Sequence, residues 1–319
     1  MASMHAAVIA LRPPVARKVA PIVLLAAFAM GELGWLSVHG VVFTGFAPVV
    51  WATLVLSAIS VAYGVSGRSA ALSEMSYYAA LWIVLALVGV ILSYICATED
   101  RPLLDEAFTR ADRALGFDWM RFYGFVQEHS NVRLMLTIAY FSGLPQIFCS
   151  IIFLAHIRRD DRNEELWWGC AIALILTSFL SGLFPAGGTL YYHQVGLDDA
   201  VHLPHFLALR AGHLTHFAFR ELAGIVSFPS YHTVMALMLI YAYRELYGFR
   251  YVFALNIVML VSTPINGGHY LVDMIGGAAV TVVAAFLAHR IRLVLSAQVQ
   301  PSQGGRHVFG KSRNRKSVA

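Results

Sequence analysis

Long apolar segments separated by short polar connections constrain this chain more than any other feature. A helix needs about 20 mostly apolar residues to cross the hydrocarbon of a bilayer. Eight runs come close to that length, of which the sixth and seventh are the shortest: 19–38, 43–63, 77–97, 134–156, 166–185, 229–247, 250–266 and 271–292. Only 13% of the residues are charged, against about 25% in soluble domains. We therefore predict an all-α polytopic membrane bundle with about eight transmembrane helices.

The runs follow one another closely enough to form one domain. We assign residues 1–296 to a single integral-membrane catalytic domain, and the polar motifs of this domain are concentrated in 186–292. Residues 297–319 are basic and poor in apolar side chains, which is typical of a disordered tail. The sequence thus predicts one membrane domain followed by a solvated tail that can contact anionic lipid headgroups.

Basic residues are distributed unevenly between the two sets of connections. If all eight runs cross the membrane, 16 Lys and Arg side chains lie on the side of the two termini and 7 lie on the other side. Connections rich in Lys and Arg remain in the cytoplasm. We therefore expect a cell (inner) membrane protein with both termini cytoplasmic. The net charge of +5 follows from this asymmetry, so a nucleic-acid partner is not expected.

An amphipathic segment lies between the third and fourth runs. Pro102 suits the first turn of a helix and Gly116 suits the position after its end. Apolar side chains fall on one face of the helix between them: Leu103, Leu104, Ala107, Phe108, Ala111 and Leu115. This pattern predicts a helix that lies in the membrane interface or caps the bundle. It would form either a structural collar or a lip that admits lipid.

The motif FPSYHT opens the sixth run. Proline at 229 favours a helix start, because its missing N–H would have no partner there. Ser230 and His232 therefore lie where free backbone N–H groups and the positive end of the helix face outward, and such an end binds phosphate readily. Ser230 offers a hydroxyl donor, and His232 offers a proton for a leaving alkoxide.

The motif GGHYLVD opens the eighth run. His269 and Asp273 are four positions apart, which places them on one helix face. A carboxylate there can hold one imidazole nitrogen and leave the other as a lone-pair nucleophile. The seventh run brings the chain back across the membrane, so we expect His232 and His269 to meet at the outer face.

Both motifs resemble signatures of the type-2 phosphatidic acid phosphatase superfamily. PSYHT, at 229–233, is similar to its middle signature, and 262–273 is similar to its last signature, in which Thr263 replaces an arginine. The first signature, Lys-x6-Arg-Pro, is missing, because Tyr94 stands seven positions before Arg101. Both departures resemble the branch that contains the inositol phosphorylceramide synthases, an inositolphosphotransferase-like group.

The resemblance implies a lipid phosphatase or phosphotransferase that needs no metal or other cofactor. It implies His269 as the nucleophile of a phosphohistidine intermediate, Asp273 as its orienting partner and His232 as the general acid. Ser230 would bind phosphate. The substrate would be a lipid phosphate among membrane lipids, and water or a polyol or sugar acceptor would receive the phosphoryl group.

Phosphate charge inside an apolar site needs compensation. Arg210 and Arg220 are the only basic side chains between the fifth run and the motifs, so we expect them to bind phosphate, Arg210 first. Either one can instead extend towards lipid headgroups.

Three alternatives remain open at this point. The protein could be a transporter or channel with a histidine-lined vestibule, or an inactive scaffold of the same fold. It could also be a metalloenzyme that uses five histidines between the fifth and sixth runs, some at metal-ligand spacing: His193, His202, His205, His213 and His216.

Overall fold

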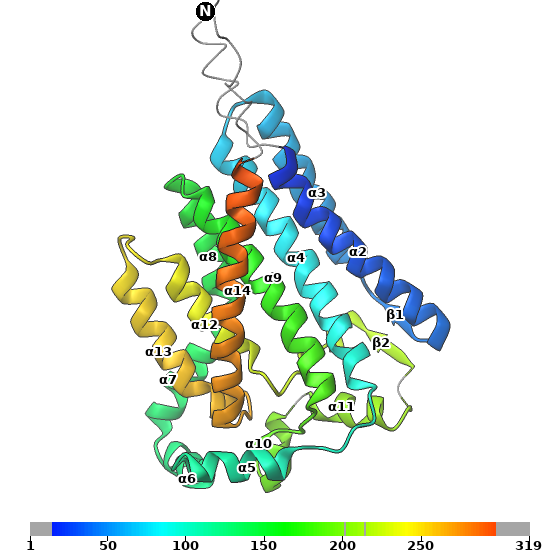
Figure 1. Cartoon of the computed structure of the whole chain (residues 1–319), viewed down its shortest axis with the longest axis vertical. Helices are drawn as coiled ribbons and strands as arrows, with labels where there is room; N and C mark the ends of the chain where they lie inside the picture. The colour runs from blue at the N-terminus through cyan, green and yellow to red at the C-terminus, as the bar shows by residue number, and fades with distance from the viewer. Residues whose placement is uncertain (1–14, 201, 214, 298–319) are drawn as a thin grey trace, which may run out of the picture.

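The protein is a bundle of long helices that run roughly side by side, with short helices across one end (Figure 1). The computed structural model describes residues 15–200, 202–213 and 215–297. Its longest helices are α2 (Val15–His39), α3 (Ala47–Ser66), α4 (Ala70–Ala97), α9 (Asp160–Leu183), α13 (Phe249–Asn266) and α14 (Leu271–Ala297). The shorter helices are α5 (Asp105–Ala114), α6 (Trp119–Glu128), α7 (Ser130–Phe141), α8 (Gly143–His156), α10 (Thr189–His193), α11 (Leu203–Arg210) and α12 (Tyr231–Ala242). Two three-residue strands, β1 (Val42–Thr44) and β2 (His216–Ala218), form one parallel pair.

The helices confirm the predicted all-α, multi-pass membrane bundle. Six of them, α2, α3, α4, α9, α13 and α14, are each long and apolar enough to cross a bilayer. The fourth predicted run is divided into α7 and α8, which meet at a bend of 49° and together would make a seventh crossing. Pro145 lies just after this bend, and a proline ring clashes with the carbonyl group four residues before it. The sixth predicted run contains only the 12-residue α12, which is apolar but short.

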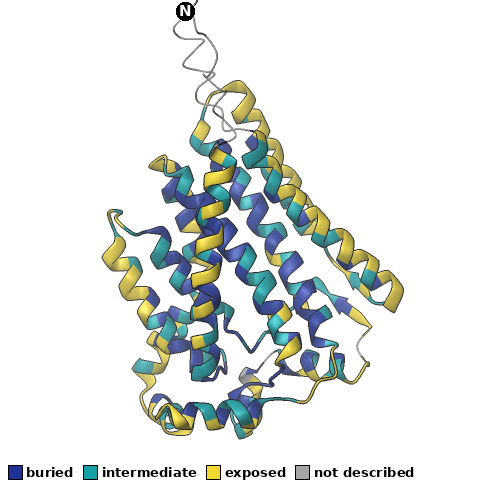
Figure 2. Cartoon of the chain, in the orientation of Figure 1, coloured by how far each residue is buried: buried dark blue, intermediate teal, exposed yellow. Residues whose placement is uncertain are grey.

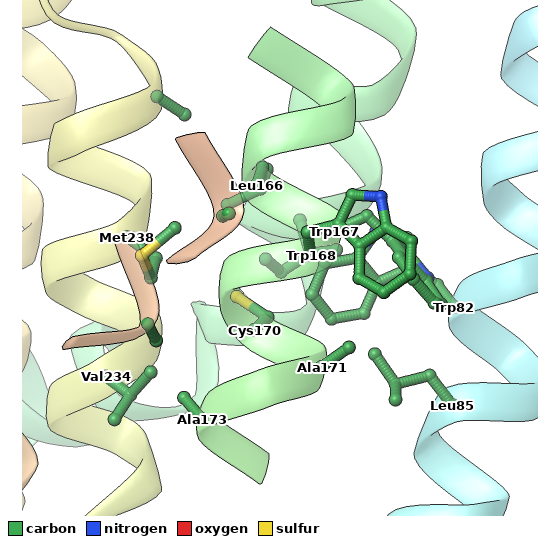
Figure 3. Close-up of a cluster of buried hydrophobic side chains, with 14 of the residues drawn as sticks. Trp82, Leu85, Leu166, Trp167, Trp168, Cys170, Ala171, Ala173, Val234 and Met238 are labelled. Carbon is green, nitrogen blue, oxygen red and sulfur yellow. The ribbon is translucent and has the colours of Figure 1, made fainter. Parts of the chain in front are cut away.

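The core of the bundle lies between α4, α9 and α12. Trp167 and Cys170 of α9 are fully buried, and Figure 3 shows α9 between Leu85 of α4 and Met238 of α12. A Cβ atom at Gly169 would lie 2.1 Å from the Met238 methyl carbon, so a glycine is needed for this close approach. α3 is exposed along almost its whole length (Figure 2), as expected for a helix that faces lipid.

The short helices α5 and α6 lie across the end of the bundle where α9 ends and α14 begins (Figure 1). α5 lies in the segment predicted to form an amphipathic helix, and it lies across the end of the bundle. Its buried residues are Asp105, Thr109 and Asp112, whereas Leu115 is 57% exposed. The two carboxylates are buried because backbone N–H groups of neighbouring segments need acceptors there.

The first residues of α2 and the last residues of α14 lie at the opposite end of the bundle from α5 (Figure 1). This arrangement agrees with an even number of crossings between them. Residues 298–319, for which we predict a disordered basic tail, lie outside the described residues.

Candidate active site

The two histidine motifs meet at the end of the bundle that α5 covers. Ser230 is the N-cap residue of α12, and its N–H donates to the backbone oxygen of Asp273 on α14 at 3.0 Å. A Cβ atom at Gly277 would lie only 2.5 Å from the Ser230 carbonyl oxygen. The glycine therefore lets the first turns of α12 and α14 touch, and this contact sets the distance between the motifs.

The imidazole rings of His232 and His269 lie close to each other. Their ring centroids are 6.5 Å apart, with an angle of 59° between the ring planes. Rings at this separation are close enough for one phosphoryl group to contact both of them.

Asp273 holds the His269 ring from one side. Its Oδ2 lies 3.2 Å from His269 Nδ1, and the same oxygen accepts hydrogen bonds from the Tyr270 N–H at 2.9 Å and the Ser227 hydroxyl at 3.4 Å. Asp273 is fully buried, and the His269 side chain is 4% exposed. With Nδ1 facing the carboxylate, Nε2 of His269 remains for chemistry.

His232 is held by a residue that the sequence analysis did not single out. Tyr140 of α7 stacks on the His232 ring with 4.1 Å between centroids, and its hydroxyl oxygen lies 3.2 Å from His232 Nδ1. This contact also leaves Nε2 free. Tyr140 lies 92 positions before His232, inside an ordinary apolar run, so no local pattern could have identified it.

The two helix starts differ in whether their N–H groups are available. At the start of α14, the N–H groups of Leu271 and Val272 donate to the carboxylate of Asp112 at 2.8 and 2.9 Å. At the start of α12, Tyr231 and His232 belong to the first turn, where a helix has no acceptor of its own. An anion at this site would therefore bind α12 rather than α14.

Ser230 is fully buried at the start of α12. Its Oγ accepts a hydrogen bond from the Thr233 N–H at 3.4 Å, as expected of an N-cap residue. The hydroxyl hydrogen remains able to donate to an anion.

Burial lowers the pKa of two histidines that lie outside the membrane-spanning helices. His269 lies in the connection between α13 and α14, and burial lowers its pKa to about 4, although a hydrogen bond with the backbone of Ser227 raises it. His202, at the start of α11, has its pKa lowered to about 4 by burial and by the charge of nearby His269, while a hydrogen bond with the backbone of Gly187 raises it. A neutral ring has a lone pair to offer to phosphorus.

The two predicted arginines lie elsewhere. Arg210 donates to the backbone oxygens of Glu99, at 2.8 Å, and of Arg101, and its guanidinium also lies 3.4 Å from the Asp100 carboxylate. The Arg220 side chain is 86% exposed and lies near Glu221. The sequence alone could not reveal that backbone carbonyl groups just after α4 accept hydrogen bonds from Arg210.

The histidine-rich segment is divided among different neighbours. His193 stacks on Trp119 with 5.2 Å between centroids, and His205 Nδ1 lies 2.7 Å from the Tyr94 hydroxyl. Within residues 15–200, 202–213 and 215–297, no three His, Cys, Asp or Glu side chains are grouped to hold a metal ion.

Comparisons with known proteins agree with this geometry. A family model described as the PAP2 superfamily matches residues 106–287. This range contains both histidine motifs, α5 from its second residue, and Tyr140. No curated protein and no solved structure gives a significant match.

Proposed function

Because the chain belongs to the PAP2 superfamily, we propose that it is a lipid phosphatase or phosphotransferase that works through a phosphohistidine at the outer membrane face. The distance of 6.5 Å between the rings of His232 and His269 is the observation that carries the proposal. Phosphatase or phosphotransferase activity is what membership of the superfamily indicates. The nucleophile, the acceptor and the membrane face are parts of our proposal.

In the first step, Nε2 of His269 attacks phosphorus, the N–P bond forms and the bond from phosphorus to the lipid oxygen breaks. His232 gives its proton to that oxygen, which leaves as a neutral alcohol. A bound phosphate anion favours the protonated form of His232, since an opposite charge stabilises the imidazolium. Asp273 keeps a proton on Nδ1 of His269 and stabilises the positive charge that develops on the ring.

In the second step, His232 takes a proton from an incoming hydroxyl group, whose oxygen attacks phosphorus while the N–P bond breaks. Water as the attacking group gives hydrolysis, and an alcohol gives transfer. The Ser230 hydroxyl and the first N–H groups of α12 bind the phosphoryl oxygens in both steps.

The charge of the site favours a phosphodiester over a phosphomonoester. Asp105 and Asp112 lie close enough to Asp273 for their charges to act on it, and Arg210 bonds to backbone groups elsewhere. A monoester brings up to two negative charges into this acidic surrounding, and a diester brings one. We therefore favour a phosphodiester as the substrate within the proposed class, with water or a polyol or sugar as the acceptor.

The test uses the purified protein in lipid nanodiscs with a panel of lipid phosphomonoesters and phosphodiesters, with and without inositol, glycerol or glucose. We expect release of the lipid alcohol, together with a phosphorylated acceptor, and the same rate after dialysis against EDTA. Turnover of monoesters alone would overturn the preference for a diester. No turnover of any phosphate lipid, together with solute flux into proteoliposomes, would support a histidine-lined transporter instead.

A further inference from the structure

We infer that Asp105 and Asp112 of α5 are positioning residues for the nucleophile. They hold the segments on both sides of His269 through hydrogen bonds to backbone N–H groups. The inference rests on the proposed role of His269. In this inference α5 contributes to catalysis and is more than a structural collar.

His269 needs support from outside its own helix. It lies in the short connection between the end of α13 at Asn266 and the start of α14 at Leu271. Gly268 in this connection has a φ of +62°, in the left-handed region that favours glycine. No helical hydrogen bonds cross such a connection, so its geometry depends on the groups packed around it.

Asp112 holds the side of the connection that follows His269. Its two carboxylate oxygens accept one hydrogen bond each, from the N–H groups of Leu271 and Val272 at 2.8 and 2.9 Å. It is 2% exposed and lies 159 positions before Leu271. This carboxylate caps α14 from another helix, and negative charge is favourable at a helix start. It thereby fixes the first turn, from which Asp273 reaches His269.

Asp105 holds the side that precedes His269, through the segment after α9. Its Oδ2 accepts from the Gly187 N–H at 3.0 Å, and its Oδ1 accepts from the Gly188 N–H at 2.9 Å. The next residue, Thr189, donates its N–H to the Gly268 carbonyl at 2.8 Å. A Cβ atom at Gly188 would lie 2.7 Å from that same carbonyl oxygen. A chain of contacts thus leads from Asp105 to the residue directly before His269.

Tyr270 connects the two sides. Its hydroxyl donates to Asp105 Oδ1 at 2.9 Å, and its backbone N–H donates to Asp273 Oδ2 at 2.9 Å. Its ring is 1% exposed and packs edge-on against Phe108 of α5, with 5.7 Å between centroids. The residue that follows the nucleophile is therefore held by α5 at the far end of its side chain.

A carboxylate is the side chain that meets these demands. Asp112 has two oxygens for two N–H donors, and Asp105 has two oxygens for three donors. An asparagine at either position keeps one oxygen and directs an NH₂ group at a backbone N–H. The conflict would move the connection, and a misplacement of about 1 Å near reacting atoms can cost about 100-fold in rate.

The experiment compares Asp105→Asn and Asp112→Asn with Glu106→Gln in the purified full-length protein. Glu106 is on the same helix, but its side chain is 71% exposed and, among the described residues, pairs with Arg110 alone. We expect kcat to fall about 10- to 100-fold in both aspartate variants, with KM within about threefold, and no change in the Glu106 variant. Rates are expressed per folded molecule, counted from the monodisperse peak in size-exclusion chromatography.

Tyr270→Phe keeps the experiment decisive if an aspartate variant fails to fold, because it removes one hydroxyl and leaves the packed ring. We expect about a threefold to tenfold fall in kcat, equivalent to one net hydrogen bond. Wild-type kcat in the folded aspartate variants and in Tyr270→Phe would overturn the inference, as would an equal loss in the Glu106 variant. Inactive wild-type protein would instead contradict the proposed function, so the two failures are distinguishable.

Discussion

Two histidine–carboxylate pairs lie near opposite ends of α14, and they differ in what surrounds them. His269 and Asp273 lie at its start, 3.2 Å apart, and His289 and Glu165 lie towards its end, 2.9 Å apart. Asp273 has backbone and hydroxyl donors as its other partners. Glu165 also binds Arg244 and Arg292.

The difference separates a pair that can react from a pair that joins helices. At Glu165, guanidinium groups from α14 and from the segment after α12 neutralise a carboxylate that is 1% exposed, and His289 is one of several donors. At Asp273 the imidazole is the only ionisable side chain that bonds to the carboxylate among the described residues. A change in the charge of His269 is therefore stabilised directly by Asp273, which a covalent intermediate on the ring requires.

The largest difference is expected from alanine at the two histidines. His269→Ala removes the nucleophile and should lower kcat by at least about 10³-fold. His289→Ala removes the imidazole of the other pair and should leave kcat near the wild-type value. Steady-state turnover of a lipid phosphate by equal amounts of folded protein measures both. Similar losses in the two variants would remove the distinction between the pairs.

The carboxylates of the two pairs should differ in effect: Asp273 should affect the catalytic rate, and Glu165 the free energy of unfolding. Asp273→Asn is expected to lower kcat by about 10²- to 10⁴-fold, because an amide no longer fixes the tautomer of His269 or stabilises its charge. Glu165→Gln should leave kcat unchanged and lower the free energy of unfolding by about 1–3 kcal/mol, since the guanidinium groups of Arg162, Arg244 and Arg292 lose their charge partner. Turnover assays and thermal unfolding in detergent test both variants. Normal turnover with Asn at 273 would contradict the assigned role of Asp273.

A smaller loss of activity is expected from crowding the contact between the first turns of α12 and α14. Gly277→Ala places a methyl group 2.5 Å from the Ser230 carbonyl oxygen, and overpacking of this kind costs about 1–3 kcal/mol. It should move Ser230 and weaken substrate binding, so KM should rise more than kcat falls. Gly124→Ala is the control, because a Cβ atom there has no atom within 4 Å. Equal kinetics in both variants would argue against phosphate binding at the start of α12.

The smallest expected effect is on the pH dependence of kcat/KM. Burial lowers the pKa of His269 to about 4, and the neutral ring is the nucleophile. Protonation of His269 removes the nucleophile, so the acid limb of kcat/KM should have its midpoint near pH 4. The measurement is kcat/KM between pH 3.5 and 7 with a water-soluble phosphate ester. An acid limb near pH 6.5, the ordinary value for histidine, would show an exposed and unperturbed ring.

Much of the fold follows from local patterns in the sequence. Each predicted apolar run contains at least one helix, although α12 begins after Ser230 and not at the predicted Pro229. The bend between α7 and α8 and the shortness of α12 were not predicted, because hydropathy averages over the residues that end a helix.

The site was predictable where its residues are close in sequence. His269 and Asp273 are four apart, and one helix face brings them together. Tyr140 and Asp112 reach the site from distant segments, and only the packing of α7 and α5 reveals them. The partners of Arg210 and Asp105 depend on which backbone groups lie near them in the fold, and a one-dimensional pattern does not contain that information.

The most direct test of the central claim is to trap the covalent intermediate. The protein is mixed with a lipid substrate labelled with ³²P at phosphorus, quenched within milliseconds in alkali, digested and sequenced by mass spectrometry. We expect label that is stable to alkali and lost in acid, carried by the peptide that contains His269 and absent from His269→Ala. Label on another residue, or complete turnover by the wild-type protein with no labelled peptide at any time, would contradict the account.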